Sequence, residues 1–105
     1  MIRRFVFAKF NGSHSTPESR KEAIEATRDE LPRIPGVTGV WVGAPCDAGS
    51  MAAWDLAIVV EFAQASDVEP YRIHPDHLAY LDQVLKPRVE VKKAWNFGDG
   101  PTGEG

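Results

Sequence analysis

Residues 2–10 carry apolar side chains on both of their alternating faces, and this feature constrains the fold more than any other. Phe5 and Phe7 lie on one face. The apolar residues of the other face are Ile2, Val6, Ala8 and Phe10. A strand with one face in water alternates apolar and polar residues, so this pattern predicts a strand that is covered on both faces. Residues 54–62 form the most apolar run of the chain, and their β-branched residues favour a second such strand over a buried helix.

The segment between these two strands predicts one helix and one further strand. Ser15, followed three residues later by Glu18, is typical of a capping box that starts a helix ending at Leu31. Pro32 and Pro35-Gly36 end this helix. Residues 37–44 predict a strand, and residues 45–51 predict a hairpin loop.

The C-terminal part predicts a second helical region and a last strand. Ser66 is the expected cap of a short helical turn that reaches Tyr71, and a longer helix is expected from Pro75 to about Lys86. Its expected inward stripe consists of Leu78, Leu81 and Leu85. Residues 89–97 alternate as a strand does, and residues 98–105, rich in Gly with Pro and acidic residues, predict a flexible tail.

The predicted order is therefore β-α-β-β-α-β, which indicates an α+β, ferredoxin-like fold with a four-stranded antiparallel sheet over residues 1–97. Two helices can cover only one face of such a sheet. Because the strands are apolar on both faces, the other face needs a partner. The commonest solution is a homodimer in which two sheets pack together.

Composition narrows the class of protein. The chain has 105 residues, which suits one compact domain, and a formal net charge of −3 without a basic block, which argues against nucleic acid as a partner. Its one cysteine, Cys46, forms no internal disulfide framework and is typical of a reducing cytoplasm. Lys9 and Asn11 interrupt the apolar N-terminus, which makes it too short for a signal peptide or a membrane span. We therefore expect a cytoplasmic protein that does not enter a membrane.

The segment Tyr71-Arg-Ile-His74-Pro75-Asp-His77 concentrates one phenol and two imidazoles within seven residues. Pro75 suits the first position of a helix, which makes His74 the expected N-cap and places His77 in the first helical turn. The positive end of the helix dipole disfavours an imidazolium there. A neutral imidazole in that position can accept a proton at neutral pH.

This segment and several shorter ones resemble the stress-responsive A/B barrel domain family, whose members are dimeric α+β barrels. The resemblance covers roughly residues 1–97, and the His-Pro-x-His element is its most specific part. The other matching segments are Lys9-Phe10, Ile34-Pro35-Gly36-Val37, Val42-Gly43, Trp54-Asp55-Leu56 and Glu61-Phe62. The family contains stress-stable proteins, uncharacterised bacterial members and plant polyketide cyclases.

The resemblance to the cyclases implies a role for Tyr71 and His77. In those enzymes a tyrosine and the second histidine of the motif carry the acid–base steps of an intramolecular aldol condensation, without a cofactor. Three polar positions differ in this chain. Arg4 and Leu56 stand where the cyclases have histidines, and Asn96 stands where many members have aspartate.

Two interpretations of the motif follow. In the first, His77 abstracts a proton next to a carbonyl and Tyr71 stabilises the enolate oxygen of a small apolar or aromatic carbonyl ligand. In the second, the His77 ring bonds a backbone carbonyl and holds the start of the helix in a non-catalytic stress or assembly protein. His74 is interpreted as a cap, and no metal site is expected because no third ligand accompanies the two histidines.

Other residues also have two interpretations. Arg4 either extends to a strand end or anchors the carboxylate of a small acid. Ile24 and Thr27 are core residues by default, or line a ligand pocket between helix and sheet. Trp41, Trp54 and Trp95 indicate core or dimer-interface packing. Cys46 has no signature of nucleophilic chemistry and is interpreted as a bystander.

Overall fold

The computed structural model describes residues 1–102 and has the predicted order of strands and main helices. Strands β1 (Ile2–Phe10), β2 (Val37–Gly43), β3 (Leu56–Phe62) and β4 (Val89–Gly98) form one sheet in the order β2-β3-β1-β4. Each neighbouring pair is antiparallel. The predicted ferredoxin-like fold with a four-stranded antiparallel sheet is confirmed.

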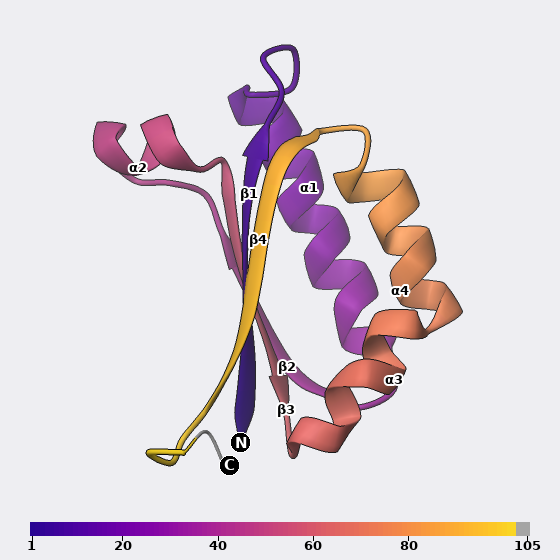
Figure 1. The fold of residues 1–105 in the computed structure, drawn as a ribbon. Coiled ribbons are helices and arrows are strands. Elements are labelled where there is room, and N and C mark those ends of the chain that lie inside the picture. The colour runs from indigo at the N-terminus through magenta and orange to yellow at the C-terminus, as the bar shows by residue number, and fades with distance from the viewer. Residues whose placement is uncertain (103–105) are drawn as a thin grey trace.

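Three helices cover one face of the sheet: α1 (Pro17–Glu30), α3 (Val68–Ile73) and α4 (Pro75–Tyr80) (Figure 1). A 3₁₀ turn, Leu31–Arg33, ends α1, and a π-helical turn, Leu81–Leu85, continues α4. The apolar core lies between these helices and the sheet. Its strand residues are Ile2, Val6, Ala8, Phe10, Val42, Leu56, Ile58, Val60 and Phe62.

Two helix starts differ from the prediction. Thr16, not Ser15, caps α1, because the Thr16 hydroxyl accepts a hydrogen bond from the Ser19 backbone N–H at 3.1 Å. Gln64, not Ser66, is the cap of the 3₁₀ turn Ala65–Asp67 that leads into α3. The prediction of Ser15 as the cap was wrong because the Ser15 hydroxyl hydrogen-bonds to a partner residue that lies far away in the sequence.

That partner is Asp55, a fully buried carboxylate at the start of β3. It accepts hydrogen bonds from the Ser15 hydroxyl at 2.7 Å, from the Phe10 backbone N–H at 2.7 Å and from Arg20 Nε at 3.1 Å. Lys9 Nζ lies 3.6 Å from the same carboxylate. A buried carboxylate is tolerated when such donors satisfy it. Asp55 therefore fixes the start of α1 against the end of β1.

Two further expectations were wrong. The predicted loop at residues 45–51 includes the start of helix α2 (Ala48–Ala53), which Asp47 caps by accepting from the Ser50 N–H at 2.7 Å. Leu78 does not face inward but is 47% exposed. The buried residues of α4 are His77 and Tyr80. The helix is therefore rotated so that its rings, which have the largest surface to bury, face the sheet.

The predicted C-terminal tail begins one residue later than expected, since Gly98 is the last residue of β4. Asp99 pairs with the N-terminal amine of Met1 and with Arg3, each at 3.3 Å. Residues 103–105 of the predicted tail lie outside the described residues. Its flexibility stays a prediction.

Among residues 1–102, α2 is the only helix that projects beside the other face of the sheet (Figure 1). Large side chains are exposed on this outer face, including Trp41 at 58%, Trp95 at 53% and Phe97 at 60%. Phe5 packs edge-on against Phe97 with ring centroids 5.6 Å apart. The predicted second apolar face of the sheet therefore exists. No helix among residues 1–102 is long and apolar enough to cross a membrane.

Candidate functional site

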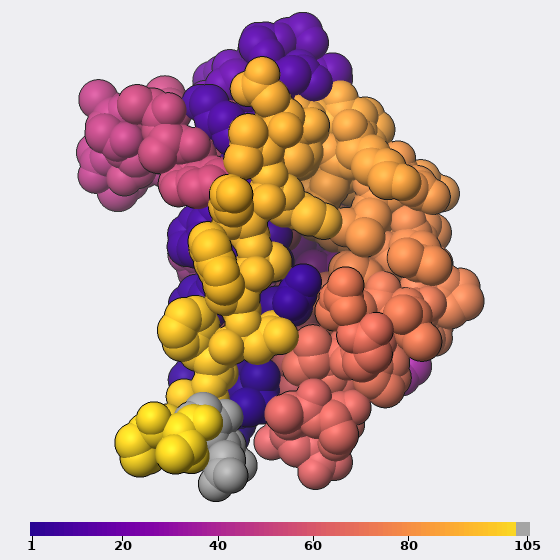
Figure 2. Space-filling model, viewed as in Figure 1, coloured from indigo at the N-terminus to yellow at the C-terminus, as the bar shows by residue number. Residues whose placement is uncertain are grey.

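A small cavity lies between the sheet and the helical layer formed by α3, α4 and the π-helical turn. It has a volume of about 30 Å³, and its apolar walls include Val6, Ile58 and Val60 from the sheet and Leu81 and Leu85 from the helical layer. Figure 2 shows the molecule hollowed between β4 and the α3–α4 side, where atoms of β1 are visible in the gap. A volume of this size holds one or two water molecules. Any larger ligand therefore needs a side chain at the mouth to move.

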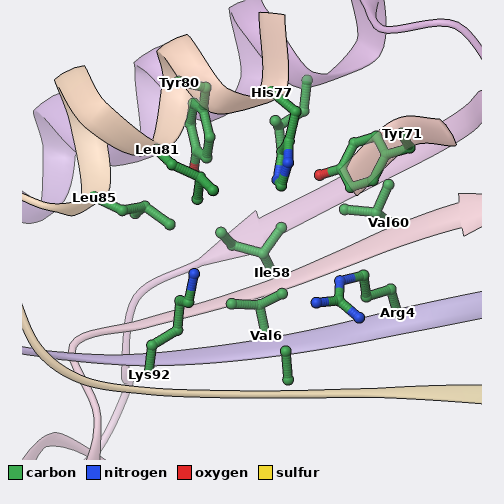
Figure 3. A pocket seen from close by; sticks show the side chains of 12 residues that line it. Arg4, Val6, Ile58, Val60, Tyr71, His77, Tyr80, Leu81, Leu85 and Lys92 are labelled. Carbon is green, nitrogen blue, oxygen red and sulfur yellow. The ribbon is translucent and has the colours of Figure 1, made fainter. Parts of the chain in front are cut away.

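Tyr71 and His77 meet at this cavity. Their ring centroids are 4.3 Å apart with an interplanar angle of 36°. Figure 3 shows the Tyr71 hydroxyl directed towards the His77 ring and the cavity. The break between α3 and α4 at His74 produces this arrangement, because it turns the chain between the two residues. Phe62 supports the Tyr71 ring from the sheet side, with centroids 5.1 Å apart.

The hydrogen bonding of His77 selects one tautomer of its ring. Its Nδ1 lies 2.9 Å from the Arg72 carbonyl oxygen. A carbonyl oxygen can only accept, so Nδ1 carries the hydrogen and donates it. In the neutral ring Nε2 is then a proton acceptor. Among the described residues none hydrogen-bonds to Nε2, and His77 lines the cavity.

Burial sets the protonation states of both rings. It is the main cause of a lowered pKa for His77, and the positive charges of Lys92, Arg4 and Arg72 lower it further, although the hydrogen bond to the Arg72 backbone acts in the opposite direction. Burial and the neighbouring cations therefore support the expected neutral imidazole. Burial also raises the pKa of Tyr71 above its ordinary value of 10.0, so its hydroxyl stays a hydrogen-bond donor at neutral pH.

Arg4 and Lys92 contribute two cationic groups to the same cavity. Arg4 lies on β1 directly opposite Asn96 on β4, and its guanidinium donates to the Asn96 amide oxygen at 3.0 Å. Arg4 and Asn96, two of the three positions that the sequence analysis singled out as departures, are thus neighbours that bond to each other. Leu56, the third, is buried in the core.

Ile24 and Thr27 do not line this cavity. Thr27 is fully buried, donates its hydroxyl hydrogen to the Ala23 carbonyl at 2.7 Å and lies 2.6 Å from the Tyr80 hydroxyl. Tyr80 thus stands between Thr27 and the cavity, which the helical period of α1 alone could not indicate. Ile24 borders a separate shallow depression with Arg20 and Arg28. The structure therefore places both residues outside this cavity, with Thr27 in the buried interior and Ile24 packed against the core, in line with their default interpretation as core residues.

His74 occupies the predicted N-cap position of α4, where its Nδ1 accepts from the Asp76 backbone N–H at 3.0 Å. It is not one of the residues that line the cavity. Cys46 is exposed near α2, on the other side of the sheet. Within residues 1–102 no group of three or more His, Cys, Asp or Glu side chains is arranged to hold a metal ion.

Sequence reasoning missed Lys92 and Tyr80 as cavity residues. Lys92 alternates with Ala94 and Asn96 along β4, opposite Ala8, Val6 and Arg4 of β1. Once Arg4 is assigned to the inner face, the period of two along an antiparallel pair also assigns Lys92 to it. This signal was available, but it required the pairing register of β1 and β4.

The four-stranded sheet and the cavity beneath its helices define an α+β, ferredoxin-like protein with a candidate small-molecule site. The chain belongs to the stress responsive A/B barrel domain family, whose model matches residues 2–94. The predicted family is therefore confirmed. A search of the curated proteins finds no match.

Solved structures with the same fold include proteins without a known function and an enzyme. A dimeric ferredoxin-like protein of unknown function from Thermobifida fusca is 28% identical, with 91% of this chain and 88% of that chain covered and a TM-score of 0.74. A Dabb family protein with a ferredoxin-like fold from Mesorhizobium loti is 24% identical, with coverages of 91% and 93% and a TM-score of 0.73. A hydroxynitrile lyase from Passiflora edulis is 14% identical, with coverages of 91% and 90% and a TM-score of 0.74.

Proposed function

We propose that this protein is a homodimeric small-molecule-binding protein that catalyses cofactor-free proton transfer on a carbonyl compound. The observation that carries the proposal is that a proton acceptor and a hydrogen-bond donor face one cavity. These groups are His77 Nε2 and the Tyr71 hydroxyl. The single cysteine further suggests that the protein works in the cytoplasm.

The proposed step uses the two groups in separate roles. His77 Nε2 takes a proton from the carbon next to the carbonyl, and the electron pair of the broken C–H bond becomes the enolate. Tyr71 donates a hydrogen bond to the oxygen that becomes negative. Where the enolate is conjugated with a neighbouring double bond, return of the proton from His77 to another carbon gives an isomer. Alternatively, the enolate carbon attacks a second carbonyl of the same molecule and closes a ring, and the alkoxide oxygen that forms takes the proton from His77.

A ligand enters this cavity only if its mouth widens. Lys92 is exposed and has a long flexible side chain, so it can move at little cost. The same fold occurs in the hydroxynitrile lyase of Passiflora edulis, so a sheet and helices arranged in this way are compatible with enzymatic activity.

Deuterium exchange tests the proposal without knowledge of the natural product. We would incubate a series of enolisable aryl ketones with the protein in D₂O and follow loss of the proton next to the carbonyl by NMR. General acid–base catalysis contributes roughly 10²–10⁴-fold, so His77→Ala should slow the exchange by about that factor. Tyr71→Phe should also slow it, because the enolate oxygen loses its donor.

Leu78→Ala is the matched control, since Leu78 follows His77 on α4 but is 47% exposed. It should exchange at the wild-type rate. Equal rates for wild type and His77→Ala, at equal folded fraction, would remove His77 from the chemistry.

The second candidate function is a non-catalytic stress or assembly protein, and two observations favour it. The cavity has a volume of only about 30 Å³. The hydrogen bond from His77 to the Arg72 carbonyl also links α4 to α3, as a purely structural histidine would. A protein that catalyses no exchange, and whose His77→Ala variant is strongly destabilised, would support this alternative.

A further inference from the structure

The cavity has an excess of positive charge, although the chain as a whole carries a net charge of −3. Arg4 and Lys92 both line it, and among the described residues no Asp or Glu does. The negative charge of Glu69 acts on Arg4. Glu69 is already paired with Arg72, however, whose Nη1 lies 2.6 Å from its carboxylate oxygen. The local charge is therefore opposite in sign to the charge of the whole chain.

Neither cation of the cavity has an ionic partner within residues 1–102. Arg4 is half-buried, and among the described residues its guanidinium hydrogen-bonds only to the neutral amide of Asn96. No described residue forms a hydrogen bond or an ion pair with Lys92. Structural arginines and lysines near a core are usually paired with carboxylates, as Arg20 is paired with the buried Asp55 in this same chain.

The positive charges around the cavity also repel one another. Lys92 is exposed as a whole, but partial desolvation of its ammonium lowers its pKa, and the charges of Arg4, Arg72 and Lys86 lower this pKa further. Burial likewise lowers the pKa of Arg4, and so does the charge of Arg72. An arrangement in which like charges face a common space costs stability unless an anion enters that space.

We propose that the ligand of this cavity is a carboxylate, whose charged group lies between Arg4 and Lys92 while its carbon skeleton contacts the apolar wall formed by Val6, Ile58 and Leu85. This inference rests on the proposed function, because it names the class of molecule that the same site takes. Two strands hold the cations, β1 for Arg4 and β4 for Lys92. Figure 3 shows Lys92 extending from the sheet towards the helices, and the Arg4 guanidinium lying over the sheet below Tyr71. His77 and Tyr71 then face the part of the ligand that lies nearest α3 and α4.

Matched acids and amides test the inference, because an amide has the shape of the acid without its charge. The probes are acetate with acetamide, which are small enough for the cavity to need little opening, and benzoate with benzamide. Binding would be followed by NMR through the ring signals of His77 and Tyr71. Hydrogen bonds to charged groups are worth enough that each acid should bind about tenfold or more tightly than its amide.

Variants test whether Arg4 and Lys92 cause the difference in affinity between each acid and its amide. Arg4→Gln and Lys92→Gln should each weaken binding of the acids about tenfold or more and leave the amides unchanged. Lys21→Gln removes one positive charge from the exposed side of α1, far from the cavity lining, and should bind the acids as wild type does. Lys92 lies on the exposed rim, so Lys92→Gln keeps the test valid if Arg4→Gln fails to fold.

The outcomes separate this inference from the proposed function. Equal affinity for acid and amide, with perturbed His77 signals, would overturn the carboxylate assignment and leave a ligand site at His77 in place. Acid binding that Arg4→Gln and Lys92→Gln do not weaken would also overturn it. If neither acids nor amides perturb the signals of His77 and Tyr71, both proposals fail.

Discussion

At the scale of single residues, His77 is a buried imidazole whose pKa is lowered. Its exposed fraction is 8%, and burial is the main cause of its lowered pKa. An imidazolium in this position would lie beside Lys92, Arg4 and Arg72 without an acidic partner among the described residues. The folded state therefore favours the neutral ring.

This preference predicts a pH dependence of stability. In the unfolded chain His77 has its ordinary pKa of 6.5, and in the folded chain its pKa is lower. Between the two values the unfolded state binds more protons, so the free energy of unfolding rises with pH. The stability due to the neutral ring is fully present above pH 6.5 and is lost as the pH falls below it. Urea unfolding between pH 7.5 and 5 measures this loss.

His77→Gln is the comparison for that experiment, because glutamine is polar but does not titrate. The variant should lose less stability than wild type over the same pH range. If wild type and variant lose the same amount on acidification, His77 does not have a lowered pKa in the folded state.

The contribution of sequence reasoning at this scale differs from residue to residue. The spacing Tyr-x-x-His-Pro-x-His led to Tyr71 and His77, which the structure brings together at one cavity. The same reasoning did not identify Lys92, because its position depends on the pairing of β1 with β4. It also left open whether Thr27 lines a pocket or packs in the core, and the structure buries this side chain with its hydroxyl 2.6 Å from the Tyr80 hydroxyl.

At the scale of elements, the junction of α3 and α4 positions the site. His74 has an extended backbone with φ −62° and ψ 137°, and it separates the two helices. Pro75 then begins α4, as expected of a residue without a backbone N–H in the first helical position. The turn was predictable from Pro75, but the rotation of α4 was not. Leucines at the right spacing suggested an inward Leu78, whereas the aromatic rings of the same helix are buried instead.

The cap at His74 predicts a change in stability without a change in chemistry. His74→Ala removes the acceptor of the Asp76 N–H and should lower the free energy of unfolding by about 0.5–2 kcal/mol. His74→Asn restores a capping acceptor and should recover most of this stability. Chemical denaturation measures both, and ketone exchange should stay near the wild-type rate. A loss of exchange at unchanged stability would instead make His74 part of the site.

At the scale of the whole molecule, the outer face of the sheet is an apolar surface that helices α1, α3 and α4 leave uncovered. Helices α1, α3 and α4 cover one face, as the sequence predicted from the number of helices available (Figure 1). The outer face exposes Trp41, Trp95 and Phe97. Such a surface is typical of an interface between subunits. The sequence could indicate this face because apolar residues occupy both sides of β1, but it could not indicate that α2 projects beside it.

We expect a homodimer that buries more than about 1,000 Å² in solution. Trp95→Glu places a charge on the outer face, on the edge strand β4, and should shift the protein to monomer. Ile73→Glu is the control, because Ile73 is 63% exposed on α3, the helical side of the molecule, and should leave the dimer intact. Light scattering at micromolar concentration distinguishes these outcomes. A wild-type protein that is monomeric under these conditions contradicts the expectation.

The central claim is that His77 is a neutral base whose Nε2 is available to a ligand next to a protonated Tyr71. Nitrogen NMR of the histidine side chains at pH 7 tests it most directly, with His77→Gln used to assign the signals. We predict that the hydrogen of the neutral ring is on Nδ1, that its pKa lies below 6.5, and that bound ligand changes the Nε2 signal. A charged ring at pH 7, or a neutral ring with its hydrogen on Nε2, would contradict the claim.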